Sequence, residues 1–293
     1  MFIPYRPDIK VTRWPIFTIV VMVLSTAILM AQRSSWSALE EYAVNFCTDE
    51  ISRDIEYPGK HYFGDRASCE EIMLYLYSEK DSRLLKKYHD EIVAKNDNYR
   101  AELLLTQYHA FAASAPSDLT SSLVYYRSSW NPVTMLTSSV SHASWDHLIG
   151  NLFFFFAFAM VVEVIIGPIL FFIVFISMSL GIGVIDSLAN LGQEDVPTLG
   201  LSGIVFGMLT LALYFAPRVK IKFFYWLIIL IGSVKIPLWM VSIWYVGWNI
   251  YDYYNDLTSN TNYIAHLGGA AVGLIMGVTL FREKRHWAQG LLP

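Results

Sequence analysis

Long apolar stretches separated by short polar segments dominate this chain. A helix needs about 20 mainly apolar residues to cross the ~30 Å hydrocarbon core of a bilayer. Six stretches reach or approach that length, at residues 14–31, 147–166, 168–188, 199–216, 236–253 and 264–281. No small-residue cleavage site follows the first stretch, so we expect a retained anchor and not a cleaved signal peptide. The pattern predicts an all-α polytopic membrane protein with a bundle of six transmembrane helices.

Basic residues gather in the short segments that flank these stretches. They precede the first stretch and follow the fourth and the sixth: Arg6, Lys10, Arg13; Arg218, Lys220, Lys222; Arg282, Lys284, Arg285. With six spans, all three clusters fall on one side, and an excess of Lys and Arg marks the cytoplasmic side. We therefore expect cytoplasmic N- and C-termini, in a bacterial inner (plasma) membrane. The short apolar run between Lys220 and Lys235 is interpreted as an interfacial or re-entrant connection.

One block of the chain has the composition of a water-soluble segment. Only 16% of the chain is charged, yet residues 40–102 hold 15 acidic and 9 basic residues, more than half of all the charges. Apolar residues recur at helical spacing from Ile72 to Ile92, so 65–113 is expected to be helical. We divide the chain into an N-terminus with its first helix (1–31), an extracytoplasmic insertion (32–127), a membrane core (128–281) and a cytoplasmic tail (282–293).

Both cysteines, Cys47 and Cys69, lie in the insertion. An extracytoplasmic location is oxidising, which favours a disulfide between them. Two unpaired thiols in a small helical core are the alternative.

A few polar residues interrupt the apolar spans, where ionisable groups are costly and indicate function. They are His142, His147, Asn151, Glu163, Ser202 and His266. Spans two, four and six would all run inward from the outer face. Their first turns then bring Ser202, His266, His147 and Asn151 to one depth. Glu163 lies about 24 Å further along its helix than His147, near the inner face, so we expect a structural role there, such as bonding a neighbouring span.

Glycines at four-residue spacing accompany the serine and one histidine. Gly203 and Gly207 follow Ser202, while Gly269 and Gly273 follow His266. Small residues allow transmembrane helices to approach closely, which would bring the hydroxyl and the imidazole together. Histidine is the usual base that activates a serine nucleophile.

Three segments together carry a specific resemblance to a known family. They are Gly200-Leu-Ser202-Gly203 with Gly207; Ala265-His266-Leu-Gly-Gly-Ala-Ala-Val-Gly273; and His142-Ala-Ser-Trp-Asp-His147-Leu-Ile-Gly-Asn151 followed by Glu163. In this order and on these spans they resemble the motifs of rhomboid intramembrane serine proteases. The resemblance covers about 130–281 and implies a rhomboid-like bundle whose first loop is enlarged and mainly helical.

The resemblance also implies roles for individual residues. Ser202 and His266 would form a catalytic dyad without an acidic third member. His147, Asn151 and the backbone N–H of Ser202 would stabilise the oxyanion. His142, Phe206, Gly200 and Gly203 are secondary candidates around this site. The implied substrates are transmembrane segments of other membrane proteins.

The chain departs from the family pattern at three points. The Trp-Arg pair of the first loop corresponds here to Val133-Thr134, Phe206 stands where the family often has Tyr, and the insertion exceeds the usual first loop. Phe206 can still stack on His266.

Other functions remain alternatives. An inactive rhomboid-like protein would bind and escort membrane clients, and a transpeptidase-like rhomboid would process sorting tails. An intramembrane aspartyl protease is suggested superficially by Tyr251-Asp252 and the segment ending in Asp186, but in the wrong order. No H-E-x-x-H motif indicates a metalloprotease. We expect no cofactor and no metal; the partners are membrane-protein substrates and the lipid bilayer, with no nucleic acid.

Overall fold

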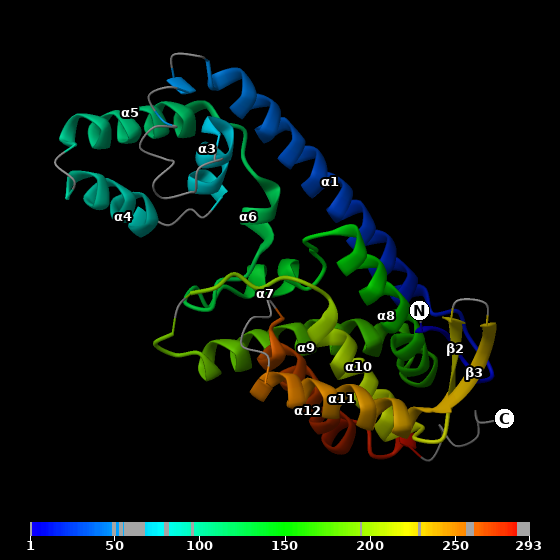
Figure 1. Ribbon diagram of the computed structural model, residues 1–293. Helices are drawn as coiled ribbons and strands as arrows, with labels where there is room; N and C mark the ends of the chain where they lie inside the picture. The colour runs from blue at the N-terminus through cyan, green and yellow to red at the C-terminus, as the bar shows by residue number, and fades with distance from the viewer. Residues whose placement is uncertain are drawn as a thin grey trace. The chain divides into compact units, whose positions relative to one another are not determined.

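The computed structural model describes residues 2–48, 51–52, 55, 68–78, 82–94, 97–193, 195–227, 230–255 and 261–285. The chain divides into two compact units, which we treat separately. The core unit comprises Met1–Leu29 with Leu123–Pro293, and the insertion unit comprises Met30–Ser122. Helix α1 (Ile16–Phe46) begins in the core unit and ends in the insertion unit (Figure 1).

The core unit is built mainly from apolar helices. They are α7 (Pro132–Ser138), α8 (Trp145–Ile166), α9 (Pro168–Ala189), α10 (Ser202–Phe215), α11 (Leu238–Asn255) and α12 (Tyr263–Leu280). Within the described residues, four helices are long and apolar enough to cross a membrane, namely α1, α8, α9 and α12, and α10 is a shorter apolar helix. The protein is thus a mostly helical, multi-pass membrane protein. The count of six crossings stays a prediction.

The helices of the core unit begin and end at residues suited to those positions. The Ser144 side chain caps α8 by accepting a hydrogen bond from the backbone N–H of His147. Gly167, at φ +86°, ends α8, and Pro168 starts α9 immediately after it. The Asn262 side chain caps α12 by accepting from the N–H of Ala265. These short caps fix where each histidine-bearing helix starts.

Glycines allow α10 and α12 to pack with their backbones in contact. A Cβ atom at Gly269 would overlap the carbonyl oxygen of Gly203, and one at Gly273 would overlap the carbonyl oxygen of Gly207. The Thr210 hydroxyl adds a hydrogen bond of 2.8 Å to the Ala270 carbonyl oxygen across the same interface. This close approach is the small-residue packing predicted for the two spans.

Glu163 joins the far end of α8 to the start of α1. Its carboxylate is fully buried and accepts hydrogen bonds from the Phe17 and Thr18 backbone N–H groups at 2.9 and 2.7 Å. The Thr18 hydroxyl donates a further bond of 2.7 Å. A negative charge at a helix N-terminus complements the helix dipole, and here it also occupies N–H groups that have no partner within their own helix. Glu163 therefore bonds a neighbouring helix, as expected.

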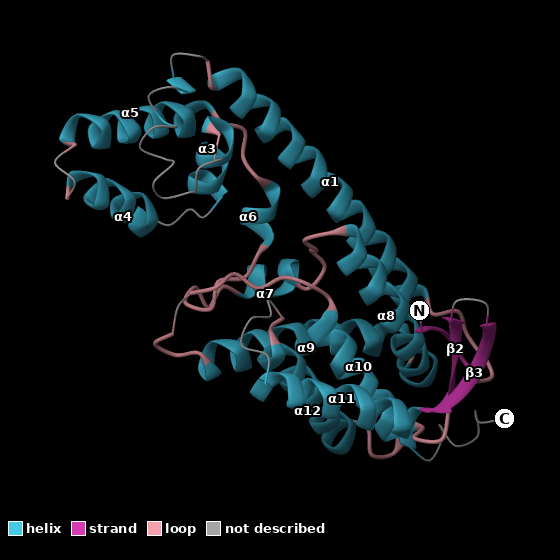
Figure 2. Ribbon diagram, in the orientation of Figure 1, coloured by secondary structure: helices cyan, strands magenta, loops and turns pink. Residues whose placement is uncertain are grey.

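The expectation of an all-α chain is wrong at the segment 220–237. Strands β2 (Lys220–Leu227) and β3 (Leu230–Pro237) form an antiparallel pair, and β1 (Phe2–Pro7) adds to β2, in the order β1-β2-β3 (Figure 2). The reason is a period of two: Ile221 and Phe223 are buried while Lys220 is exposed. A hydropathy window averages this alternation away. Prolines are tolerated in β1 because it is an edge strand.

The insertion unit has its own small core. Helices α3 (Cys69–Ser78), α4 (Ser82–Val93), α5 (Asn98–Ser114) and α6 (Leu119–Leu123) follow the end of α1. Ile72, Leu76 and Ile92 from the predicted amphipathic stripe are buried there. Residues 65–67, 79–81 and 95–96 of the segment expected to be helical lie outside the described residues, as do residues 286–293 of the expected tail.

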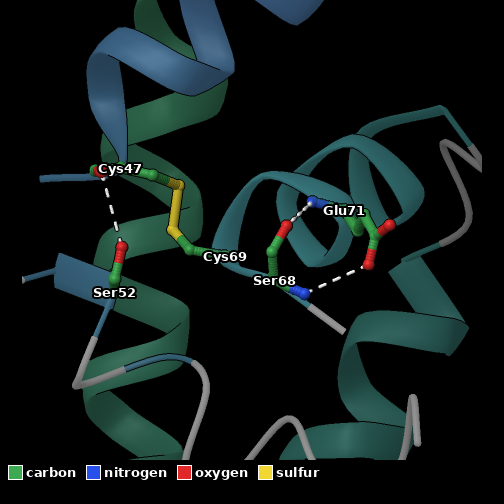
Figure 3. The surroundings of a disulfide bond; sticks show 5 residues. All are labelled: Cys47, Ser52, Ser68, Cys69 and Glu71. Carbon is green, nitrogen blue, oxygen red and sulfur yellow. Dashed lines mark hydrogen bonds between the residues drawn. A yellow bond between two sulfur atoms is a disulfide. The ribbon is translucent and has the colours of Figure 1, made fainter. Parts of the chain in front are cut away.

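A disulfide connects two segments of this unit. Cys47, just beyond α1, is bonded to Cys69 at the start of α3, with their Cα atoms 5.9 Å apart (Figure 3). Beside it, the Ser68 hydroxyl accepts from the Glu71 N–H, while the Glu71 carboxylate accepts from the Ser68 N–H. This reciprocal capping box fixes the first turn of α3 and hence the position of Cys69.

Candidate active site

The N-terminal turns of α10 and α12 place a hydroxyl against an imidazole. Ser202 is the first residue of α10, and its Oγ lies 2.8 Å from Nε2 of His266 in the first turn of α12. Both side chains are partly buried. The distance is that of a hydrogen bond, and it is the contact through which an imidazole can remove a serine proton.

Aromatic rings hold the imidazole of His266 in place. The Phe206 ring, one turn below Ser202 on α10, stacks on it with centroids 4.7 Å apart and planes inclined by 9°. The Tyr263 ring meets it edge-on at 6.5 Å. Phe206 thus provides the stacking surface expected of it, without the hydroxyl that a tyrosine would add.

The second nitrogen of His266 is also occupied. Its Nδ1 lies 2.7 Å from Oδ1 of Asn249, a residue of α11. Asn249 is 5% exposed, and its Nδ2 donates a hydrogen bond of 3.3 Å to the backbone carbonyl oxygen of Tyr263. The imidazole is therefore held between a hydroxyl from α10 and an amide from α11.

The backbone just before Ser202 requires a glycine, and it lies against a histidine of α8. Gly200 has φ +125°, a conformation that L side chains rarely adopt, and its N–H donates to the Ser138 carbonyl oxygen. A Cβ at this position would lie 2.8 Å from Cε1 of His147 and 3.8 Å from Oγ of Ser202. His147 and Ser202 consequently flank the same small space, which only a residue without a side chain leaves open.

His142 packs behind His147. The two rings meet nearly edge-on, with centroids 5.2 Å apart, and His142 is 1% exposed. Burial, with a smaller contribution from the neighbouring His147, lowers the pKa of His142 to about 4. A neutral ring at this place can support His147 without adding a charge beside it.

Asn151 contributes a buried amide in the first half of α8. It lies one turn after His147 on α8 and is 9% exposed, and in the part of the chain that the structure describes its Nδ2 has no bonded acceptor. At the start of α10, Leu201 occupies the N-cap position and makes no capping bond with its side chain. An amide N–H donor and a helix N-terminus both suit a developing negative charge, so the Asn151 amide and the start of α10 stay candidates for that role.

A second polar cluster supports these helix ends. The Asp186 carboxylate, 1% exposed near the end of α9, accepts hydrogen bonds from Arg127 Nε, Thr198 Oγ1, Asn190 Nδ2 and Asn262 Nδ2. It thereby ties the loop before Ser202 to the residue that caps α12. Asp186 is an anion held by a cation, whereas an aspartyl dyad shares a proton between two carboxyl groups. This geometry argues against the aspartyl alternative.

The structure gathers most of the predicted site residues in the core unit. Ser202, His266, Phe206, Gly200 and His147 lie at the α10–α12 junction, with His142 and Gly203 packed beside it; Gly203 contacts α12 through Gly269. Cys47 and Cys69 belong to the insertion unit and take no part in this geometry.

Asn249 was not predicted. The topology could have indicated it, because predicted span five ends at the same face at which span six begins, and Asn249 is a polar residue in the second half of span five.

Comparison with known proteins points to one family. A family model described as "Rhomboid domain" matches residues 129–283. A stretch of 149 residues is 29% identical to Rhomboid-like protein 11, chloroplastic, of Arabidopsis thaliana, and covers 48% of this chain and 50% of the plant protein. The chain therefore spans about half the length of that curated relative.

Proposed function

We propose that this chain, which belongs to the rhomboid family, is an intramembrane serine endopeptidase that cleaves transmembrane segments of other membrane proteins. One observation carries the proposal: the 2.8 Å contact between Ser202 Oγ and His266 Nε2. A serine hydroxyl is a weak nucleophile unless a neighbouring base takes its proton. A protein that only bound its clients would have no need of this pair.

In the proposed reaction, Ser202 Oγ attacks the carbonyl carbon of the scissile peptide while its proton passes to His266 Nε2. The carbonyl oxygen becomes an oxyanion, for which Asn151 Nδ2, His147 and the Ser202 backbone N–H are the proposed donors. When the C–N bond breaks, His266 gives its proton to the departing amine, leaving an acyl-enzyme. Water, deprotonated by His266, then attacks the ester, and the proton returns to Ser202 as the acid is released.

The depth of the site supports a substrate that lies in the membrane. Ser202, His266 and His147 all occupy first turns of apolar helices, and a residue at that level meets a bilayer-embedded segment near its end. Extracytoplasmic placement of this face, with both termini in the cytoplasm, is part of the proposal. So is a bacterial plasma membrane; the name of the plant relative assigns that protein to the chloroplast.

The experiment compares the wild type with Ser202→Ala in proteoliposomes that contain a reporter with one transmembrane segment. We expect two products whose masses sum to reporter plus water, and none from Ser202→Ala. A product carrying an added amine would indicate the transpeptidase-like alternative. Reporter that co-purifies with the wild type but stays intact would indicate the escort function and contradict the proposal.

A further inference from the structure

Asn249 occupies a position that a stability role alone does not explain. It is a buried amide on α11, and it contacts the side of His266 opposite to Ser202, with Oδ1 2.7 Å from Nδ1. It comes from a different helix than either partner of the Ser–His pair. Both hydrogen bonds of the Asn249 side chain thus go to α12. One reaches the imidazole of His266, and the other reaches the backbone of Tyr263, the first residue of that helix.

The orientation of this amide is fixed by chemistry. The Tyr263 carbonyl oxygen can only accept a hydrogen bond, so the Asn249 group that faces it must be the NH₂. The amide oxygen then faces the imidazole. An oxygen can only accept, which means that Nδ1 of His266 must carry a proton. In a neutral imidazole Nε2 is then unprotonated, and its lone pair points at the Ser202 hydroxyl.

From this geometry we infer that Asn249 is a positioning residue for the reaction, which holds His266 in the tautomer that can accept the Ser202 proton. The inference rests on the proposed function and adds a third member to the Ser–His pair. After proton transfer the imidazolium still donates from Nδ1 to the amide oxygen, so the same bond serves before and after the step. An inverted tautomer would present an N–H to the serine and could not act as its base.

An amide also suits the burial of this position. A carboxylate at a site that is 5% exposed would bring an additional charge into an apolar region, at a high free-energy cost. A neutral amide supplies the same acceptor at lower cost. It stabilises the imidazolium less than a carboxylate would, and this difference makes the inference testable.

The test measures the rate at which a fluorophosphonate probe labels Ser202 in the full-length protein in liposomes. The probe needs only the nucleophile and its base, so no natural substrate is required. The variants are Asn249→Ala, Asn249→Leu, which keeps the side-chain volume, and Asn249→Asp. The matched control is Ser242→Ala, because Ser242 is also buried on α11 and its hydroxyl bonds, among the described residues, only to the Leu238 carbonyl oxygen of its own helix.

We expect the Ala and Leu variants to be labelled about 10- to 100-fold more slowly, by analogy with the loss when a group that orients a metal-binding histidine is removed. Ser242→Ala should be labelled at the wild-type rate. In reporter cleavage, Asn249→Ala should lower kcat and leave KM unchanged. Labelling of Asn249→Ala and Asn249→Leu at the wild-type rate would overturn the inference while leaving the proposed function intact. A wild type that is not labelled at Ser202 would overturn both.

The pH profile separates positioning from a purely structural role. The carboxylate of Asn249→Asp favours the imidazolium, so the pH at which labelling reaches half its plateau should rise by about one unit or more, with a plateau above that of Asn249→Ala. His147 also interacts electrostatically with His266. Because all the variants keep His147, this interaction does not contribute to the difference between their pH profiles. If the Asp variant keeps the wild-type profile and its rate falls to that of Asn249→Ala, Asn249 acts only through the fold.

Discussion

Two buried polar side chains on the same helix, α8, differ in whether their hydrogen-bonding groups have partners. Glu163, near the end of α8, receives three hydrogen bonds from the start of α1. Asn151, near the beginning of α8, has an amide nitrogen with no bonded acceptor among the described residues. A side chain whose bonding capacity is filled by its own fold holds that fold together. One that keeps a donor in reserve is suited to a group that arrives later, such as a substrate carbonyl oxygen.

The surrounding apolar helices make this difference informative. A buried polar group without a partner costs free energy, and more so where water cannot reach it. Asp186 follows the pattern of Glu163, since both of its carboxylate oxygens accept hydrogen bonds from neighbouring side chains. The Asn151 amide nitrogen therefore differs from the two carboxylates, whose oxygens all have donors.

Among the substitutions that test this comparison, Asn151→Ala should have the largest effect on catalysis. Loss of one oxyanion donor lowers kcat by about 10²–10³-fold. We expect this loss in reporter cleavage, with KM unchanged. Thermal unfolding should show the stability of the wild type. Asn190→Ala is the matched control, because Asn190 is equally buried but donates to Asp186. It should lower the unfolding temperature and leave kcat of the folded protein unchanged. If the two substitutions changed kcat and the unfolding temperature equally, Asn151 would have no role beyond that of a structural amide such as Asn190.

Glu163→Ala should act on stability and not on chemistry. Three bonds to the carboxylate are lost, and at roughly 1.5 kcal/mol each the free energy of unfolding should fall by about 4.5 kcal/mol. Glu163→Gln keeps one acceptor oxygen and should lose less. Both are followed by thermal unfolding in liposomes, with kcat measured below the transition. A selective fall in kcat of the folded variant would place Glu163 among the catalytic groups.

The smallest effect on cleavage should come from the disulfide. Replacing Cys47 and Cys69 together by Ser should destabilise the insertion unit by about 3 kcal/mol, detected as faster proteolysis of the Met30–Ser122 segment. Wild-type protein without reductant is the reference. Cleavage of a reporter that has little sequence outside the membrane should continue at the wild-type rate. Failure to cleave it would make the insertion unit part of the catalytic fold.

The apolar helices and the Ser–His contact could be predicted because each rests on a local signal. Helix positions follow from runs of apolar residues, and close approach of α10 and α12 follows from Gly203, Gly207, Gly269 and Gly273. Each of the six predicted spans overlaps a helix of the structure. α1, however, extends to Phe46, well beyond the apolar run that ends at residue 31. Water-exposed helical turns carry no hydropathy signal, so its end was not predicted.

The sheet and Asn249 were missed for reasons of geometry. Strand β1 pairs with β2 across more than 200 positions of sequence, and no local pattern specifies such a partner. Asn249 lies in the second half of a span that runs toward the site, whereas the depth argument considered only spans that begin there. Asp186 also lies near the end of a helix, and its sequence context resembles only superficially an aspartyl-protease motif. Helix C-termini that reach the same face can supply polar side chains to a site just as helix N-termini do.

The most direct test of the central claim is to locate the fluorophosphonate adduct by mass spectrometry of the purified wild-type protein and of His266→Ala. If His266 activates Ser202 as the 2.8 Å contact indicates, the adduct lies on the peptide containing Ser202 and is absent from the His266→Ala protein, which remains folded. An adduct on another residue, or undiminished labelling of Ser202 without His266, would contradict the account.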